Sequence, residues 1–162
     1  MRGFRHWRWH LDEMFMKING ETHYLWRAVD HEGEILESYI TQKRDKRATS
    51  KFLRKALKQH GKAEKIVTDG LKSYHSAMRE LGNENHREMG RWNNNRVENS
   101  HLPFRRRERV MPRFRRMKSL QKFSSFHADT HNHFNSQRHL VYRQIFKESR
   151  SVALVKWQFL AA

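Results

Sequence analysis

The feature of this chain that most restricts its fold is a tight turn between two extended, aromatic-rich segments near the N-terminus. Residues 7–18 (WRWHLDEMFMKI) and residues 22–30 (THYLWRAVD) are typical of β-strands, and Asn19-Gly20 separates them. Asn-Gly is the strongest short hairpin signal, because a type I′ turn needs positive φ angles at both central residues. The sequence therefore predicts an antiparallel hairpin here.

The segments that follow extend this hairpin into a mixed sheet. Residues 34–42 follow a second tight turn and alternate apolar and polar side chains, which predicts a third antiparallel strand. Residues 46–60 carry apolar side chains on one helical face. Residues 65–68 form a short apolar strand, which a crossover helix would place parallel to the first strand. A shorter helix follows, and residues 86–92 are expected to add a fifth strand.

These elements predict an α/β protein with a ribonuclease H-like fold, built on a mixed five-stranded sheet with helices on both sides. At 162 residues the chain is long enough for one domain with a substantial core. Residues 1–115 are expected to form this core. Residues 116–162 have a mostly helical pattern and are expected to form a helical C-terminal extension packed on the core.

The charge balance points to a polyanionic partner. The chain holds 34 Lys and Arg against 17 Asp and Glu, a net charge of +17, and such a surface attracts phosphates and releases their counterions. The excess is dense between Arg87 and Lys122, where it predicts phosphate contacts, although a solvated basic face would have the same composition. The DNA-binding candidates in this stretch are Arg96, Arg105, Arg106, Arg107, Arg109, Arg113, Arg115 and Arg116.

Several classes of protein are excluded by what the sequence lacks. There are no cysteines, so disulfides and thiolate zinc sites are excluded. The basic N-terminus has no apolar signal-peptide core, and no segment approaches the length of a membrane span. We therefore expect no membrane association and a cytoplasmic protein bound to the nucleoid.

Three acidic residues in different local settings are candidates for a metal-dependent site. Asp12 lies in the first strand, Asp69 directly follows the short parallel strand, and Glu98 begins a basic helix. Magnesium takes oxygen ligands, and a pair of ions can clamp the attacking and leaving oxygens of a phosphodiester. Taken singly, each acid also has an ordinary interpretation: an arginine partner, a turn residue and a solvated surface side chain, respectively.

Neighbouring residues add detail to this candidate site. Arg105 lies about two helical turns after Glu98 on the same face, where its cation could contact a phosphate. Glu13 is expected to point to the opposite face of the strand from Asp12 and to be solvated. A separate candidate for a metal site, a weak signal without a carboxylate or thiolate partner, is a histidine cluster with helical spacing: His127, His131 and His133.

The sequence around the three acids resembles a known family. The segments WHLDE, KIVTDGLKSY and NNNRVENSHLPFRRRERVM resemble the IS-six family of bacterial insertion-sequence DDE transposases, and the resemblance extends over nearly the whole chain. It implies that Asp12, Asp69 and Glu98 are the catalytic triad and the metal ligands. It also implies that Arg105 takes the place of the basic residue that follows the glutamate in the family.

The resemblance implies further properties of the protein. These are a ribonuclease H-like fold, two Mg²⁺ ions for which Mn²⁺ can substitute, cleavage and strand transfer of DNA, and a homodimer. Double-stranded DNA would be the partner, both as element ends and as target.

An alternative is a truncated, catalytically silent remnant that binds DNA. Members of the family usually carry an N-terminal region that recognises element ends, and the residues before the first strand are too few for one, whether or not Met1 is the natural start. The chain is therefore expected to be a catalytic domain that is N-terminally short. An RNA-binding protein would leave the spaced acids unexplained.

Overall fold

The computed structural model describes residues 8–89, 95–111, 113–135 and 142–161, and its centre is a mixed sheet. The strand order is β3-β2-β1-β4-β5. The strands are β1 (Arg8–Ile18), β2 (Glu21–Asp30), β3 (Ile35–Thr41), β4 (Lys65–Thr68) and β5 (Arg87–Met89). Strand β1 is central, because it pairs antiparallel with β2 and parallel with β4. The predicted ribonuclease H-like sheet is confirmed. Residues 90–92 of the predicted fifth strand lie outside the described residues.

The β1–β2 hairpin forms as the sequence predicts. Asn19 and Gly20 have φ angles of 51° and 83°, so both occupy the left-handed region that a type I′ turn requires. The register runs from the pair Trp9–Asp30 to the pair Ile18–Glu21 without a bulge. This long, regular hairpin holds β1 rigidly in the middle of the sheet.

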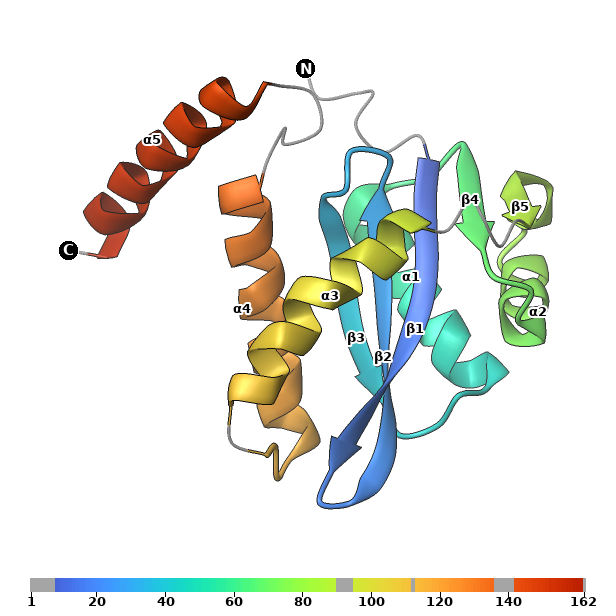
Figure 1. The fold of residues 1–162 in the computed structure, drawn as a ribbon. Helices are drawn as coiled ribbons and strands as arrows, with labels where there is room; N and C mark the ends of the chain where they lie inside the picture. Colours follow the sequence, from blue (N-terminus) through green and yellow to red (C-terminus); the bar gives the residue numbers. More distant parts are fainter. Residues whose placement is uncertain (1–7, 90–94, 112, 136–141, 162) are drawn as a thin grey trace.

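Helices cover both faces of the sheet (Figure 1). On one face lie α1 (Lys46–His60) and α2 (Lys72–Glu80), and on the other lie α3 (Asn95–Val110) and α4 (Met117–Asn135). Short η1 (Glu84–His86) joins α2 to β5. The bounds of α1 are those that the sequence predicts. Asp45 begins α1, because its carboxylate accepts a hydrogen bond of 2.8 Å from the Ala48 amide.

Two apolar clusters lie on opposite faces of the sheet. On the α1 and α2 face, Trp26 packs between Phe52 and Tyr74, and all three side chains are fully buried. On the other face, Leu25 packs with Phe104 of α3 and Leu120 of α4. The neighbouring residues Leu25 and Trp26 therefore belong to different clusters, because successive side chains of a strand point to opposite faces of the sheet.

Helix α4 also covers part of the β3 edge of the sheet. The side-chain amide of Gln121 accepts from the Ile40 amide and donates to the Ser38 carbonyl, at 2.9 and 2.7 Å. Asn132 makes the same pair of bonds with Ile35, both at 2.8 Å. An open strand edge can pair with another chain, and these two amides occupy part of the β3 edge.

The last helix, α5 (Arg143–Ala161), contacts α4 and otherwise reaches away from the sheet (Figure 1). Trp157 makes part of this contact, since its ring lies 6.1 Å from that of Phe126 and 5.9 Å from that of Phe134. The predicted division of the chain at residue 115 stays a prediction. Among the described helices, none combines the length and apolar character needed to cross a bilayer.

Candidate metal and nucleic-acid site

The sheet itself brings Asp12 and Asp69 together. Leu11 of β1 is paired with Thr68 of β4, so the residues that come next, Asp12 and Asp69, emerge beside each other where β4 ends. One carboxylate oxygen each from Asp12, Glu13 and Asp69 lies within 4.8 Å of the other two. Among the residues that the structure describes, these three form the acidic group compact enough to hold a metal ion.

Glu13 is not solvated, and that prediction is wrong. Its side chain is 4% exposed and forms an ion pair with Arg44, which lies just before α1. Strand alternation does send Glu13 to the other face from Asp12, since their β2 partners are Trp26 and Arg27. That face is closed to solvent, however, because Arg44 and the α1 and α2 side chains cover it.

The pKa of Asp12 lies far above its ordinary value. Burial is the largest cause and repulsion by Glu13 is the next, and together with Asp69 and Glu98 they raise the pKa of Asp12 from 3.8 to about 7. The Nδ1 atom of His101 lies 3.8 Å from Oδ2 of Asp12. Burial, followed by the positive charges of Arg27 and Arg105, lowers the pKa of His101 to about 3, so this imidazole is neutral beside the carboxylates.

Glu98 of α3 lies near enough to this site to act on Asp12 electrostatically. It lies in the first turn of α3, its side chain is exposed, and its negative charge contributes to the raised pKa of Asp12. It is not part of the compact group formed by Asp12, Glu13 and Asp69. The third predicted acid therefore lies near the first two without being packed against them.

Arg105 anchors α3 to the central strand. Its guanidinium donates to the carbonyl of Phe15 in β1, and a second nitrogen donates to Glu108 at 2.8 Å. The Arg105 side chain remains 33% exposed. Its predicted contact with a phosphate stays a prediction.

Arg27, which is not among the predicted site residues, also fixes α3 to the sheet. The side chain is fully buried, donates to the Ser100 carbonyl at 2.8 Å and lies over the Phe104 ring at 4.9 Å. Burial lowers its pKa to about 9. An arginine inside the apolar segment YLWRAVD was the available signal, since a charged residue in a core strand requires a partner.

The arginines predicted to bind DNA lie mainly on α3 and the connection to α4. Arg106, Arg107, Arg109, Arg113, Arg115 and Arg116 are exposed. Nothing is described of the Arg96 side chain, although its backbone belongs to α3.

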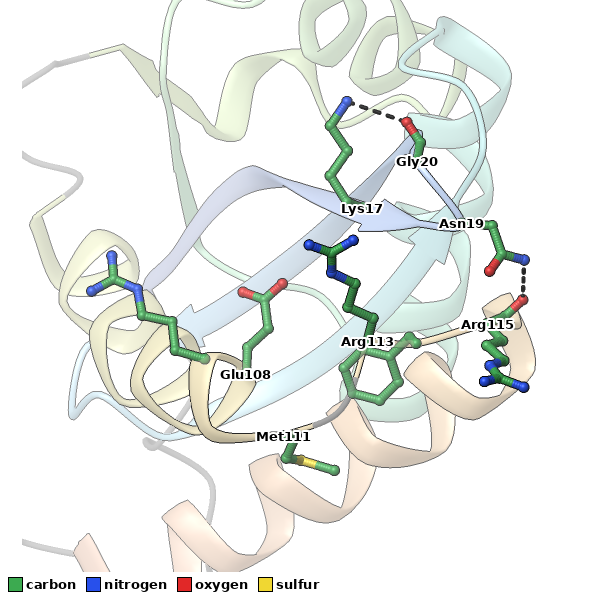
Figure 2. A pocket seen from close by; sticks show the side chains of 9 residues that line it. Lys17, Asn19, Gly20, Glu108, Met111, Arg113 and Arg115 are labelled. Carbon is green, nitrogen blue, oxygen red and sulfur yellow. Dashed lines mark hydrogen bonds between the residues drawn. The ribbon is translucent and has the colours of Figure 1, made fainter.

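Three of these basic residues line an open pocket of about 820 Å³ between the β1–β2 turn and the end of α3 (Figure 2). Arg109, Arg113 and Arg115 share its wall with Lys17 and with a single acid, Glu108. Asn19 fixes the turn to this wall by donating to the Arg115 carbonyl at 2.9 Å.

The three histidines of α4 act as packing residues. The rings of His127 and His131 stack with centroids 6.1 Å apart, and His127 also lies against Phe104. The Nε2 atom of His133 lies 2.7 Å from the Ala153 carbonyl of α5, so its N–H can donate there. In the part of the chain that the structure describes, no metal-binding group includes a histidine.

The fold and the acidic group define a class of protein: a ribonuclease H-like domain with carboxylates gathered at the end of its central parallel strand pair. A family model described as a DDE domain, of the IS240 transposase type, matches residues 6–137. The chain belongs to the DDE transposases of the IS-six family.

Two curated relatives are transposases from Staphylococcus aureus, one for the insertion sequence-like element IS431mec and one for the element IS257 in transposon Tn4003. Each is 37% identical to this chain over 73 residues. The match covers 45% of this chain and 33% of each relative, so the chain spans about a third of their length.

Among solved structures, the catalytic core domain of HTLV-2 integrase in complex with magnesium, in its dimeric form, is similar to this chain with a TM-score of 0.49. The two are 16% identical, and the similarity covers 60% of this chain and 66% of that one.

Proposed function

We propose that this chain is the catalytic domain of an insertion-sequence transposase, which cuts DNA at element ends and joins the resulting 3′ ends to target DNA. The observation that supports this most directly is that Asp12 and Asp69 meet where β4 ends beside β1, near Glu98, in a chain of the DDE family. Strand register and a helix anchored twice to the sheet hold these acids in place.

The residues fit a divalent metal ion, and enzymes of this family generally use one. Carboxylate oxygens are the ligands that Mg²⁺ prefers, and here carboxylates are crowded into a half-buried space. Burial and the neighbouring carboxylates raise the pKa of Asp12, which supports a site where the ionised acid is favoured by a bound cation. Asp12, Asp69 and Glu98 would hold two Mg²⁺ ions, or Mn²⁺ in their place. Bound there, the ions would activate the attacking oxygen and stabilise the leaving oxygen.

The protein contributes position and charge to this reaction. Asp12 and Asp69 are fixed by adjacent parallel strands, whereas Glu98 depends on the placement of α3. That placement is maintained by Arg27, through Ser100, and by Arg105, through Phe15. A phosphate contact by Arg105 is compatible with its partly exposed guanidinium. His101 is neutral, so it adds no positive charge that would repel a metal ion.

Double-stranded DNA is the proposed partner, and the exposed arginines of α3 and the pocket of Figure 2 are its proposed contacts. We propose that these contacts are with the phosphate backbone, which takes most protein–DNA hydrogen bonds and positions the duplex without reading its sequence. A protein acting on bacterial DNA would work in the cytoplasm at the nucleoid. The dimer expected of a transposase that handles paired ends belongs to the same proposal.

Strand joining is the experiment that tests this function. A short duplex with a preformed 3′-OH end is incubated with the chain, Mn²⁺ and a supercoiled plasmid, which makes recognition and cleavage of an element end unnecessary. We expect joining by the wild type and by Asp129→Asn, a matched control on the exposed surface of α4, and none by Asp69→Asn. Salt-sensitive DNA binding without joining in any condition would favour a catalytically silent remnant.

A further inference from the structure

We propose that Glu13 is a further metal ligand, which binds the same ion as Asp12 and Asp69. This inference rests on the proposed metal-dependent function and concerns a residue outside the three acids that the family pattern supplies. The argument begins from geometry, since a carboxylate oxygen of Glu13 lies within 4.8 Å of oxygens from both aspartates. Glu98 is outside this group, so the compact acidic cluster of the structure contains Glu13 in its place.

The two neighbouring acids of β1 reach the site from opposite faces of the sheet. Asp12 is paired with Arg27 and faces α3, whereas Glu13 is paired with Trp26 and faces α1 and α2. Glu13 belongs to the compact acidic group, whereas Glu98 influences Asp12 from α3, on the face of the sheet that Asp12 points to. An ion held by Asp12, Asp69 and Glu13 would therefore be separate from a position shared by Asp12 and Glu98.

The hydrogen bonding of Glu13 is incomplete. Its side chain is 4% exposed, and Arg44 contacts Oε1, while Oε2 is buried and has no hydrogen bond within 3.5 Å. The Tyr74 hydroxyl is also buried and donates no hydrogen bond to this oxygen. A buried carboxylate oxygen without a donor is unfavourable, and coordination of a cation would satisfy it.

The balance of charges around the three carboxylates also favours a bound cation. Arg44 supplies one positive charge to a space that holds three carboxylates. A divalent cation would neutralise the remaining charge, and it would be bound by oxygens alone, the donor set that Mg²⁺ and Mn²⁺ accept.

A second buried glutamate shows what an ordinary structural ion pair looks like in this fold. The Glu37 side chain is 7% exposed, its Oε1 atom accepts from Lys55 at 3.0 Å and from the Ser38 amide at 2.9 Å, and no other acid is grouped with it. Glu37 is thus as buried as Glu13 and similarly paired, but among the described residues it belongs to no group of acids that could hold a metal ion. It provides a matched control.

The test is Mn²⁺ binding to the full chain without DNA, measured by calorimetry for the wild type, Glu13→Gln, Glu37→Gln and Asp69→Asn. Loss of a ligand is expected to weaken binding by about tenfold or more, because even outer-shell substitutions reach that size. We expect this loss in Glu13→Gln and Asp69→Asn, and wild-type affinity in Glu37→Gln. Wild-type affinity in a folded Glu13→Gln protein would overturn the assignment.

A second variant keeps the proposal testable if Glu13→Gln does not fold. Arg44→Gln leaves the Glu13 carboxylate in place and removes its competing cation, so Mn²⁺ should bind more tightly than to the wild type. Unchanged or weaker binding would overturn the proposal. A different result would count against the proposed function itself: Asp69→Asn binding Mn²⁺ as tightly as the wild type does.

Discussion

Replacing Asp12 with asparagine should make the metal-free protein more stable at pH 8 while removing its activity. Burial and the neighbouring carboxylates raise the pKa of Asp12 from 3.8 to about 7. An unfolded chain ionises this residue at its ordinary pKa, so between about pH 4 and pH 7 the folded state holds a proton that the unfolded state has lost. Wild-type stability from this group therefore falls as the pH rises through that window and stays low above it.

The size of the effect follows from the same pKa. At about 1.4 kcal/mol for each tenfold change, a pKa raised from 3.8 to about 7 corresponds to at most roughly 4 kcal/mol. The side chain is 16% exposed, and an asparagine amide also has to be desolvated. We therefore expect a gain of about 1–2 kcal/mol, which in a chain of this length is about 2–8 °C in Tm.

Thermal unfolding in EDTA at pH 5 and pH 8, for the wild type and Asp12→Asn, measures this directly. The variant should gain stability relative to the wild type between pH 5 and pH 8, and it should be the more stable of the two at pH 8. Saturating Mn²⁺ should reverse the order at pH 8, because the ion stabilises only the protein that binds it. The electrostatic explanation would be refuted if Asp12→Asn were less stable than the wild type at pH 8. It would also be refuted if the difference in Tm between the two proteins were the same at both pH values.

Three further predictions concern other parts of the molecule. Glu98→Gln should abolish strand joining but change the free energy of unfolding by less than about 0.5 kcal/mol, because Glu98 is exposed; a large loss of stability by urea unfolding would contradict its placement. Asp45→Ala should lower stability by about 1 kcal/mol through loss of the α1 cap, and an unchanged urea midpoint would argue against that hydrogen bond. Arg113→Ala should lower the slope of log K for DNA binding against log salt concentration by about one, equally for all DNA sequences. An unaltered slope would show that Arg113 in the pocket does not contact DNA phosphates.

The parts of the fold that the sequence predicted are those determined locally. Asn19-Gly20 favours a type I′ turn, and the helix over residues 46–60 follows from apolar residues on one face and from Gly61 after its last turn. The burial of Glu13 was missed because alternation gives the direction of a side chain and not what covers it. Arg44 and Tyr74 come from other elements, and only the tertiary structure places them there.

The candidate site was predictable from family resemblance more than from single residues. Asp12, Asp69 and Glu98 each have an ordinary local explanation, and nothing in their spacing states that they meet. The register of β1 and β4 brings the aspartates together, and the anchoring of α3 by Arg27 sets the distance to Glu98. Arg27 acts through the Ser100 carbonyl, a contact between segments 73 residues apart that no local pattern encodes.

Anomalous diffraction from crystals soaked in Mn²⁺ tests the central claim most directly, because it locates the ion among the carboxylates. We predict a peak coordinated by Asp12 and Asp69, and a second, filled at higher Mn²⁺ or with DNA bound, between Asp12 and Glu98. Both peaks should disappear in Asp12→Asn crystals of the same form. Manganese bound elsewhere, or a site unaffected by Asp12→Asn, would contradict the assignment of these acids as the metal-binding centre of a DDE transposase.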